Sequence, residues 1–388
     1  MSEPHPTAPA RPSKPSPDFP LFPHAAGVWA KKIRGKMYYF GPWSDPDGAL
    51  AKYLAQKDAL HAGRKPREAA AGVTVKDAAN AFLNHKQARL DTGELSARTF
   101  AEYRETCNLI VSEFGKRRLL DDLDAADFTA LRDKLAKKWG PVRLGNAVQR
   151  VRSVFKHALD AGLVDRPVRF GPGLTRPSAK VLRLHRAKQG AKLFTAAEVR
   201  SLIAAAAQPL KAMLLLGANA GFGMADCGAL PVSALDLAAA WVSFPRPKTG
   251  IPRRCALWPE TVDALKEALK KRPEPKDPAD AGLVFLTRQG RPWAKATASS
   301  PAVYKVSALM RRLAINGRKG LGFYTLRHVF RTVADEAKDQ PAADFIMGHA
   351  RDDMASVYRE RIGDERLKAV AEHVRAWLFP LKKTKAKK

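Results

Sequence analysis

Residues 347–362 read MGHARDDMASVYRERI, a charged segment of helical character that contains a Gly-His pair and, nine residues beyond the histidine, a single tyrosine. A core helix has little use for this combination. A histidine can donate or transfer a proton, and a tyrosine hydroxyl can attack phosphorus as a nucleophile. Whether the two residues form a site depends on what the rest of the chain offers to a phosphate.

The charge of the chain favours a polyanionic partner. The 388 residues carry a formal net charge of +30, and the sequence pI is about 10.2. Nucleic acid neutralises such a surface best; an anionic membrane is a distant second, and a basic surface without a specific partner stays an alternative. Three widely spaced cysteines predict neither a disulfide framework nor a metal site, and no apolar run is continuous enough to cross a membrane.

The first 70 residues predict a small domain that follows a disordered leader. The leader covers residues 1–20 and is rich in proline, and the domain covers residues 21–70. The runs VWAKKI and KMYYFG flank Arg34-Gly35 and predict a β-hairpin, which a helix follows. One basic and aromatic face of this sheet could enter a DNA groove, or could be a solvated edge. The cations predicted to contact DNA are Lys31, Lys32, Arg34 and Lys36.

Residues 73–168 predict a domain made only of helices. Four segments carry apolar residues at helical spacing. The last of them bears several cations that could contact phosphates, although a solvated helix face explains them equally well; Arg150 and Arg152 are the predicted DNA contacts. Residues 169–191 have no periodicity and predict an extended basic linker. At the other end, residues 380–388 predict a disordered basic tail.

Residues 192–379 predict a mixed α and β domain. Thr195 and Glu198 form a capping box at the start of a helix, and LKAMLLLGANAGFG predicts a buried helix. WVSFPRPKTGIPRRCALWP predicts a β-hairpin that turns at Lys248-Thr249-Gly250, LVFLT a short buried strand, and YTLRHVFRTVADEA another helix. A last helix has an apolar stripe that packs on its own domain or on a neighbouring subunit. The predicted fold class is therefore mainly α and multidomain.

The order of motifs in this last domain resembles the tyrosine recombinases, the phage-integrase family of DNA strand-exchange enzymes. Members of that family carry a lysine in a β-hairpin, an H-x-x-R box that opens a helix, a Gly-His pair and a tyrosine nucleophile. The matching residues here are Lys248, Arg327, His349 and Tyr358, and Tyr324 stands where the box has its histidine. The resemblance implies an arm-binding-like domain, a core-binding-like domain and an α+β catalytic domain, and it is specific only in residues 192–379.

The chemistry of these residue types is consistent with that resemblance. A tyrosine can store the energy of a broken phosphodiester as a phosphotyrosine ester, without metal or nucleotide cofactor. Arg327 can hold two phosphate oxygens and stays protonated, and His349 can donate to the same phosphate or assist proton transfer. Lys248, at a hairpin tip, can protonate the leaving 5′ oxygen. Tyr324 can hydrogen-bond a phosphate, but it is a poorer base than histidine near neutral pH.

The chain departs from the family pattern at a second arginine. The family motif T-G-x-R-x-x-E corresponds to residues 220–226, where Gly223 takes the arginine position and Asp226 the acidic one. Loss of one fixed donor to the phosphate typically lowers the rate on the order of 10²–10³-fold. The nearest replacements in sequence flank Lys248 on the same hairpin: Arg246, Arg253 and Arg254, of which Arg253 and Arg254 are also predicted DNA contacts.

The resemblance thus implies a site-specific recombinase that acts on double-stranded DNA through a 3′-phosphotyrosine, assembles into a DNA-dependent homotetramer and works in the cytoplasm. Metal and nucleotide cofactors are not expected. The competing hypothesis is a degenerate relative that binds DNA as an accessory or regulatory factor and cuts poorly or not at all. An RNA-binding protein is a third, remote possibility, because no stacking motif is recognisable.

Overall fold

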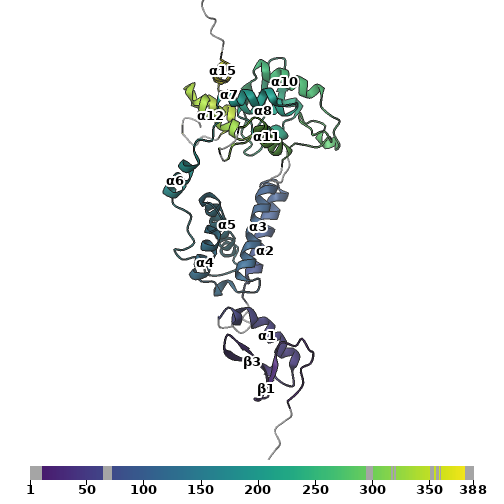
Figure 1. Cartoon of the computed structure of the whole chain (residues 1–388), viewed down its shortest axis with the longest axis vertical. Coiled ribbons are helices and arrows are strands. Elements are labelled where there is room, and N and C mark those ends of the chain that lie inside the picture. Colours follow the sequence, from purple (N-terminus) through teal and green to yellow (C-terminus); the bar gives the residue numbers. More distant parts are fainter. Residues whose placement is uncertain are drawn as a thin grey trace, which may run out of the picture. The chain divides into compact units, whose positions relative to one another are not determined.

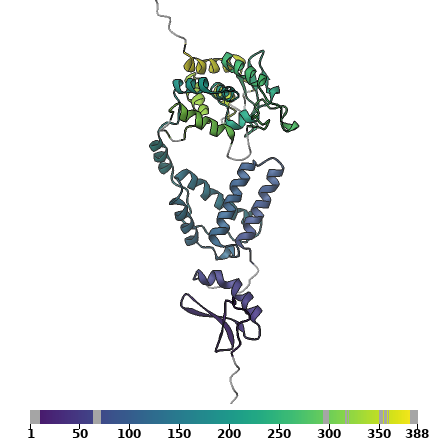
Figure 2. The same ribbon diagram turned by 45° about the vertical axis from the view of Figure 1, so that its right-hand side comes forward.

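The structure is a computed structural model, and it describes residues 11–63, 72–293, 300–315, 318, 320–349, 354, 358 and 360–380. The chain forms two compact units, Met1–Ser178 and Ala179–Lys388, whose ribbons are drawn in Figures 1 and 2. Residues 381–388 of the predicted basic tail and residues 1–10 of the predicted leader lie outside the described residues. Among the described helices, none combines the length and the apolar composition needed to cross a bilayer.

The amino-terminal part of the first unit is a three-stranded antiparallel sheet with one helix. The strands are β1 (Phe22–His24), β2 (Val28–Ile33) and β3 (Lys36–Pro42), in that order, and α1 (Pro46–His61) packs against the sheet. The predicted turn at Arg34-Gly35 is confirmed: both residues have positive φ, which is typical of a tight hairpin. The prediction of disorder up to residue 20 is wrong at Phe19, whose buried ring packs edge-on against Trp29.

The two faces of this sheet differ, because side chains alternate along each strand. Trp29 is buried on one face, and the Lys31 ammonium lies 4.7 Å from the centre of the Tyr53 ring of α1. On the other face, Lys32 pairs with Met37 of β3, and both side chains are exposed. The predicted basic and aromatic face is therefore divided: Lys31 and Trp29 face the helix, whereas Lys32 faces solvent.

The four predicted helices of residues 73–168 are confirmed. They are α2 (Val75–Asp91), α3 (Ala97–Phe114), α4 (Ala125–Ala136) and α5 (Pro141–Asp160). Thr74 and Asp124 cap α2 and α4 with complete capping boxes, which satisfy backbone N–H groups at the two helix starts. Their apolar faces enclose a core of their own that includes Phe82, Phe128 and Phe155.

The predicted extended linker is wrong in one respect. Within residues 169–191, Ala179–Gln189 form the helix α6. None of its residues is buried, so α6 has no buried apolar face that a periodic pattern would reveal. The segment AKVLRLHRAKQ is rich in the strong helix formers alanine, leucine, arginine and lysine, and this composition accounts for the helix.

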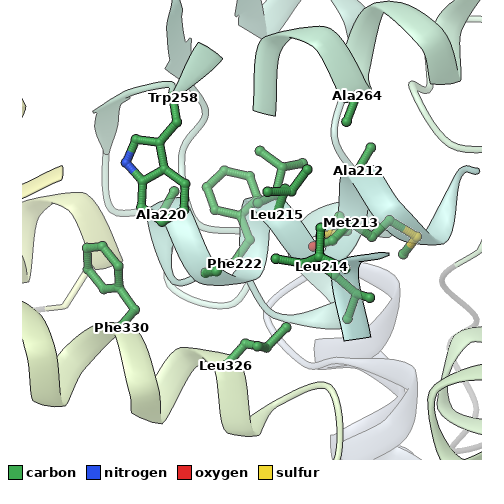
Figure 3. Packing of buried hydrophobic residues seen from close by; sticks show 14 of the residues in the cluster. Ala212, Met213, Leu214, Leu215, Ala220, Phe222, Trp258, Ala264, Leu326 and Phe330 are labelled. Atoms are coloured by element: carbon green, nitrogen blue, oxygen red, sulfur yellow. The ribbon is translucent and has the colours of Figure 1, made fainter. Parts of the chain in front are cut away.

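The second unit is built around α8 (Leu210–Ala220), in which every residue except Lys211 is buried. The surrounding helices are α7 (Ala196–Ala205), α9 (Met224–Gly228), α10 (Pro259–Lys270), α11 (Pro301–Arg312), α12 (Thr325–Glu336) and α13 (Gln340–Met347). Leu326 and Phe330 of α12 point toward α8, near Ala220 and Phe222 (Figure 3). The predicted capping box of Thr195 and Glu198 is confirmed at the start of α7.

A small antiparallel sheet completes this unit. Its strands are β4 (Leu235–Asp236), β5 (Trp241–Ser243) and β6 (Arg254–Ala256), and the predicted hairpin joins β5 to β6. The predicted strand LVFLT is not formed. Leu283 and Leu286 make only isolated bridges, to Pro231 and Pro292, and a proline cannot donate the second bond that would extend a ladder.

The last helix, α15 (Asp364–Leu378), packs on its own unit rather than presenting its stripe to solvent. The predicted stripe residues are all buried in the same core as α8: Leu367, Val370, Val374 and Leu378. Trp258, at the start of α10, donates its indole N–H to the Ala371 carbonyl at 2.9 Å. Of the two alternatives for this stripe, packing within the domain is the one observed.

Candidate active site

Arg327 is buried, and three hydrogen-bond acceptors fix its guanidinium. It lies in the first turn of α12 and is only 3% exposed. Its guanidinium donates to the Gly221 carbonyl at 2.6 Å, to the Met347 carbonyl at 2.7 Å and to His349 Nε2 at 2.8 Å. Burial, followed by the nearby cation Arg246, lowers the Arg327 pKa to about 10, so the group remains charged at neutral pH.

His349 is fixed in one tautomer by its neighbours. Because a guanidinium can only donate, Nε2 must accept from Arg327, and the ring proton of the neutral form lies on Nδ1. Nδ1 is 3.5 Å from the Asp344 carboxylate of α13, which in turn pairs with Arg331, one helical turn beyond Arg327. The imidazole is therefore oriented from both sides, as in sites where a carboxylate fixes a histidine.

The pKa of His349 is lowered, first by burial and then by Arg327 and Arg246, while Asp344 acts in the opposite direction. We therefore expect the imidazole to titrate below the ordinary value of about 6.5, and Asp344→Asn to lower its midpoint further. Since the unfolded chain then takes up this proton first, acidification through that range favours unfolding. NMR titration of the ring nitrogens measures both midpoints; a wild-type midpoint at or above the ordinary value would contradict the assigned contacts.

The glycine of the Gly-His pair is required by its surroundings. Gly348 ends α13 with φ +61°, a left-handed conformation that favours glycine. A Cβ at this position would come within 3.0 Å of Arg246 Cβ and 3.5 Å of Arg253 Cδ. Two hairpin arginines therefore lie directly against the residue that precedes His349, and a side chain there would displace them.

Lys248 lies at the exposed tip of the β5–β6 hairpin. The tip is closed by backbone hydrogen bonds from Arg246 to Ile251 and from Gly250 to Arg246, at 2.9 and 2.8 Å. Gly250 has φ +69°, as the turn requires. The ammonium is held by no contact within the described part of the chain, so it is available to a ligand that reaches the tip.

Tyr358 is 75% exposed, the most exposed of the large hydrophobic side chains in the described residues. Its neighbours 350–353, 355–357 and 359 lie outside the described residues, and no distance joins its hydroxyl to Arg327 or His349. Four predicted catalytic residues are thus placed in two ways. Arg327 and His349 are in contact, whereas the side chains of Lys248 and Tyr358 are exposed.

The two residues that depart from the family pattern, Gly223 and Tyr324, are neighbours in space. Gly223 precedes α9, and its N–H donates to the Asp226 carboxylate at 2.6 Å. A Cβ on Gly223 would lie 3.8 Å from the ring of Tyr324, which is itself 54% exposed. The position that lacks an arginine and the position that lacks a histidine therefore adjoin each other beside Arg327.

The hairpin arginines point to different sides. Arg253 is 3% exposed, and its Nη2 lies 3.1 Å from Asp226 in a buried ion pair. Arg254 pairs with Asp364 at 3.0 Å and lies over the Trp241 ring, on the outer side of the sheet. Arg246 is half-buried, and it lies against Gly348. Only Arg246 and Arg253 thus approach the site.

The other cations predicted to contact DNA differ in their exposure and in their partners within the protein. Lys32, Arg34 and Lys36 are exposed on the amino-terminal sheet. In the helical domain, Arg150 pairs with Glu102, and Arg152 donates to the Leu174 carbonyl and stacks on Phe170. These arginines hold their own domain together in the structure, so contact with DNA would have to compete with internal partners.

Two residues of the site are not identified by the sequence: Arg331 and Asp344. Arg331 could have been found, because it lies four residues after Arg327 on the same helix face. Asp344 gives no such signal: it comes five residues before His349, and only the turn at Gly348 brings its carboxylate back to the imidazole.

Comparison with known proteins agrees with this geometry. Residues 192–362 match the phage integrase family, while no curated protein sequence is significantly similar to the chain. The chain resembles the Tn1549 transposon integrase bound to a circular intermediate DNA, with a TM-score of 0.57 and 16% identity over 78% of this chain and 99% of that one. It also resembles a lambda integrase dimer bound to a COC′ core site, with a TM-score of 0.50 and 17% identity over 91% and 98%.

A lambda integrase tetramer bound to a Holliday junction is similar to the same extent, with a TM-score of 0.51 and 17% identity over 90% of this chain and 98% of that one. At such identities the likeness shows the fold. The predicted fold class is confirmed: a small amino-terminal sheet with a helix, a helical domain, and an α+β domain of the kind that lambda integrase has.

Proposed function

We propose that this chain, whose residues 192–362 belong to the phage integrase family of tyrosine recombinases, cuts and rejoins DNA at specific sites through a 3′-phosphotyrosine on Tyr358. The observation that carries the proposal is the Arg327–His349 contact, with Asp344 behind it. These groups form a rigid, cationic floor that suits a phosphodiester, and the exposed phenol of Tyr358 follows nine residues later.

In the proposed reaction, Tyr358 Oη forms a bond to phosphorus while the bond to the 5′ oxygen breaks. The phenolic proton passes to Nε2 of the neutral His349, whose lone pair is freed when the Arg327 N–H that it accepts turns to the phosphate. The 5′ oxygen takes a proton from the Lys248 ammonium. Arg327 stabilises the negative charge on the non-bridging oxygens, where charge builds up in the transition state. Attack by a 5′ hydroxyl on the phosphotyrosine reverses these steps and reseals a strand.

The proposed partner is double-stranded DNA, held by the domains of residues 73–168 and 192–379, with the sheet of residues 21–70 as an additional contact. The net charge of +30 supports this assignment. Because the similar structures include a dimer on a core site and a tetramer on a Holliday junction, we propose a DNA-dependent homotetramer. A cytoplasmic location fits a protein that acts on DNA.

A nicked suicide substrate tests the proposal. If Tyr358 attacks next to the nick, a short DNA fragment diffuses away and the protein stays covalently attached to DNA. We expect an adduct that survives denaturation, and peptide mapping should place the modification on Tyr358. The competing hypothesis, a DNA-binding protein that does not cut, is favoured by Gly223. It predicts salt-sensitive binding without any adduct, and that outcome would refute the enzymatic proposal.

The amino-terminal sheet offers a matched pair of variants. Lys32 faces solvent, whereas Lys31 lies over Tyr53 on the helix-covered face. The plot of log affinity against log salt concentration has a negative slope. If the open face contacts a phosphate, Lys32→Ala should make this slope less steep by about 0.9, and Lys31→Ala should leave it unchanged. Fluorescence anisotropy with duplex DNA at several salt concentrations measures the slopes. Equal slopes in wild type and Lys32→Ala would exclude this face as a DNA contact.

A further inference from the structure

Arg253 is a buried cation with an incomplete set of partners. Its Nε donates to the Phe244 carbonyl at 2.7 Å, and its guanidinium carbon lies 3.8 Å from the centre of the Phe222 ring. Apart from the ion pair of Nη2 with Asp226, the two Nη atoms are buried and have no hydrogen-bond partner among the described residues. Buried donors without partners are costly and rare in folded proteins, so a ligand is a reasonable explanation.

The surroundings of Arg253 are those of the arginine that the family motif would place at residue 223. Phe222, directly before that position, stacks on the Arg253 guanidinium, and Asp226, three residues after it, carries the opposing charge. The same carboxylate accepts the Gly223 N–H. The Arg253 guanidinium therefore lies beside the backbone from which the missing side chain would have extended.

Arg253 is also as deeply placed as Arg327. Both residues are 3% exposed, and Arg253 is among the cations that lower the Arg327 pKa. The half-buried Arg246 lies near both of them, while Asp226 is the carboxylate that opposes their charge among the described residues. Such an excess of buried positive charge is destabilising by itself, and a bound anion would relieve it.

We infer that Arg253, delivered by the β5–β6 hairpin, supplies the scissile phosphate with the second guanidinium that Gly223 cannot provide. This inference rests on the proposed recombinase function. Asp226 and the Phe222 ring hold the guanidinium in place before DNA binds. The neighbouring Arg254 cannot share the task, because it points to the outer side of the sheet and pairs with Asp364.

The test compares Arg253→Gln with Arg254→Gln on two nicked suicide substrates. One substrate carries a normal scissile phosphate; the other carries a methylphosphonate there, which removes the negative charge that a second cation would neutralise. On the normal phosphate we expect Arg253→Gln to form adduct at least 100-fold more slowly than wild type, with DNA affinity within threefold. On the methylphosphonate, Arg253→Gln and wild type should differ by less than tenfold. With DNA at saturating concentration, so that a change in affinity has no effect, Arg254→Gln should match the wild-type rate on both substrates.

Restoring the family arrangement gives a second measurement. A Cβ at Gly223 would lie 3.1 Å from Asp226 Oδ2, so the carboxylate must shift slightly, and 3.8 Å from the Tyr324 ring. The backbone at Gly223, with φ −89°, accepts a side chain. We expect Gly223→Arg combined with Arg253→Gln to recover at least tenfold of the rate on the normal phosphate.

The outcomes separate the two proposals. If Arg253→Gln is as fast as wild type on the normal phosphate, the inference about Arg253 is overturned while the recombinase function stands. Equal loss on both substrates assigns Arg253 a structural role only, and also overturns it. If wild type forms no adduct on either substrate, the proposed function fails, and the role of Arg253 in the reaction fails with it.

Discussion

Tyr358→Phe should form no covalent adduct with a nicked DNA substrate and should bind the same DNA as tightly as wild type. The substitution removes only the hydroxyl that would become esterified to phosphorus, and no other described group can replace it as a nucleophile at this position. Because the side chain is 75% exposed, the loss of one oxygen should leave the free energy of unfolding nearly unchanged. Gel separation under denaturing conditions measures the adduct, and anisotropy measures the affinity.

Tyr304→Phe is the matched control. Tyr304 lies on α11 of the same unit and is 66% exposed, so it controls for removal of a phenol from a solvated surface. We expect adduct formation by this variant at the wild-type rate. Persistence of the adduct in Tyr358→Phe, or its loss in Tyr304→Phe, would mean that Tyr358 is not the nucleophile.

Much of the fold can be predicted because local signals agree with the tertiary structure. The capping boxes at Thr74, Asp124 and Thr195 mark where helices begin, and the helical spacing of apolar residues marks the faces that they bury. The turn at Arg34-Gly35 likewise identifies the β2–β3 hairpin. Where local signals are missing, as in α6, which buries no residue, prediction from pattern fails.

The site is predictable where its residues belong to local motifs, and unpredictable where strand register decides. Arg253 and Arg254 are adjacent and chemically identical, so composition cannot tell them apart. The hairpin pairs Ser243 with Arg254, and alternation along the strand then sends Arg253 inward and Arg254 outward. A shift of one residue would exchange them, and nothing in the sequence of the hairpin alone fixes that register.

The division of the amino-terminal sheet has the same origin. Lys31 and Lys32 appear equivalent in a cationic run, yet alternation places one over Tyr53 and the other in solvent. The sequence could show that a hairpin forms there, but it could not show which face α1 would cover. Residue pairs that differ by one position therefore make the most informative variants for this protein.

Arg327→Lys should lower the rate of adduct formation on the order of 10²–10³-fold, although the charge is retained. Arg327 donates simultaneously to Gly221, Met347 and His349, and its planar group fixes the direction of the remaining donors. A lysine ammonium is a compact charge with three donors on a flexible stem, and it cannot satisfy these acceptors while also holding two phosphate oxygens. Single-turnover adduct formation at saturating DNA isolates this effect from binding.

Arg375→Lys controls for the general effect of exchanging arginine for lysine in this unit. Arg375 lies on α15 and forms a two-point ion pair with Glu260, with no contact to the site among the described residues. We expect a wild-type rate for this variant, because lysine keeps the charge of this partly exposed ion pair, and such surface pairs contribute only up to about 1 kcal/mol to stability. If Arg327→Lys also cleaves at the wild-type rate, then charge alone at the floor of the site would suffice. The fixed geometry around His349 would in that case have no part in catalysis.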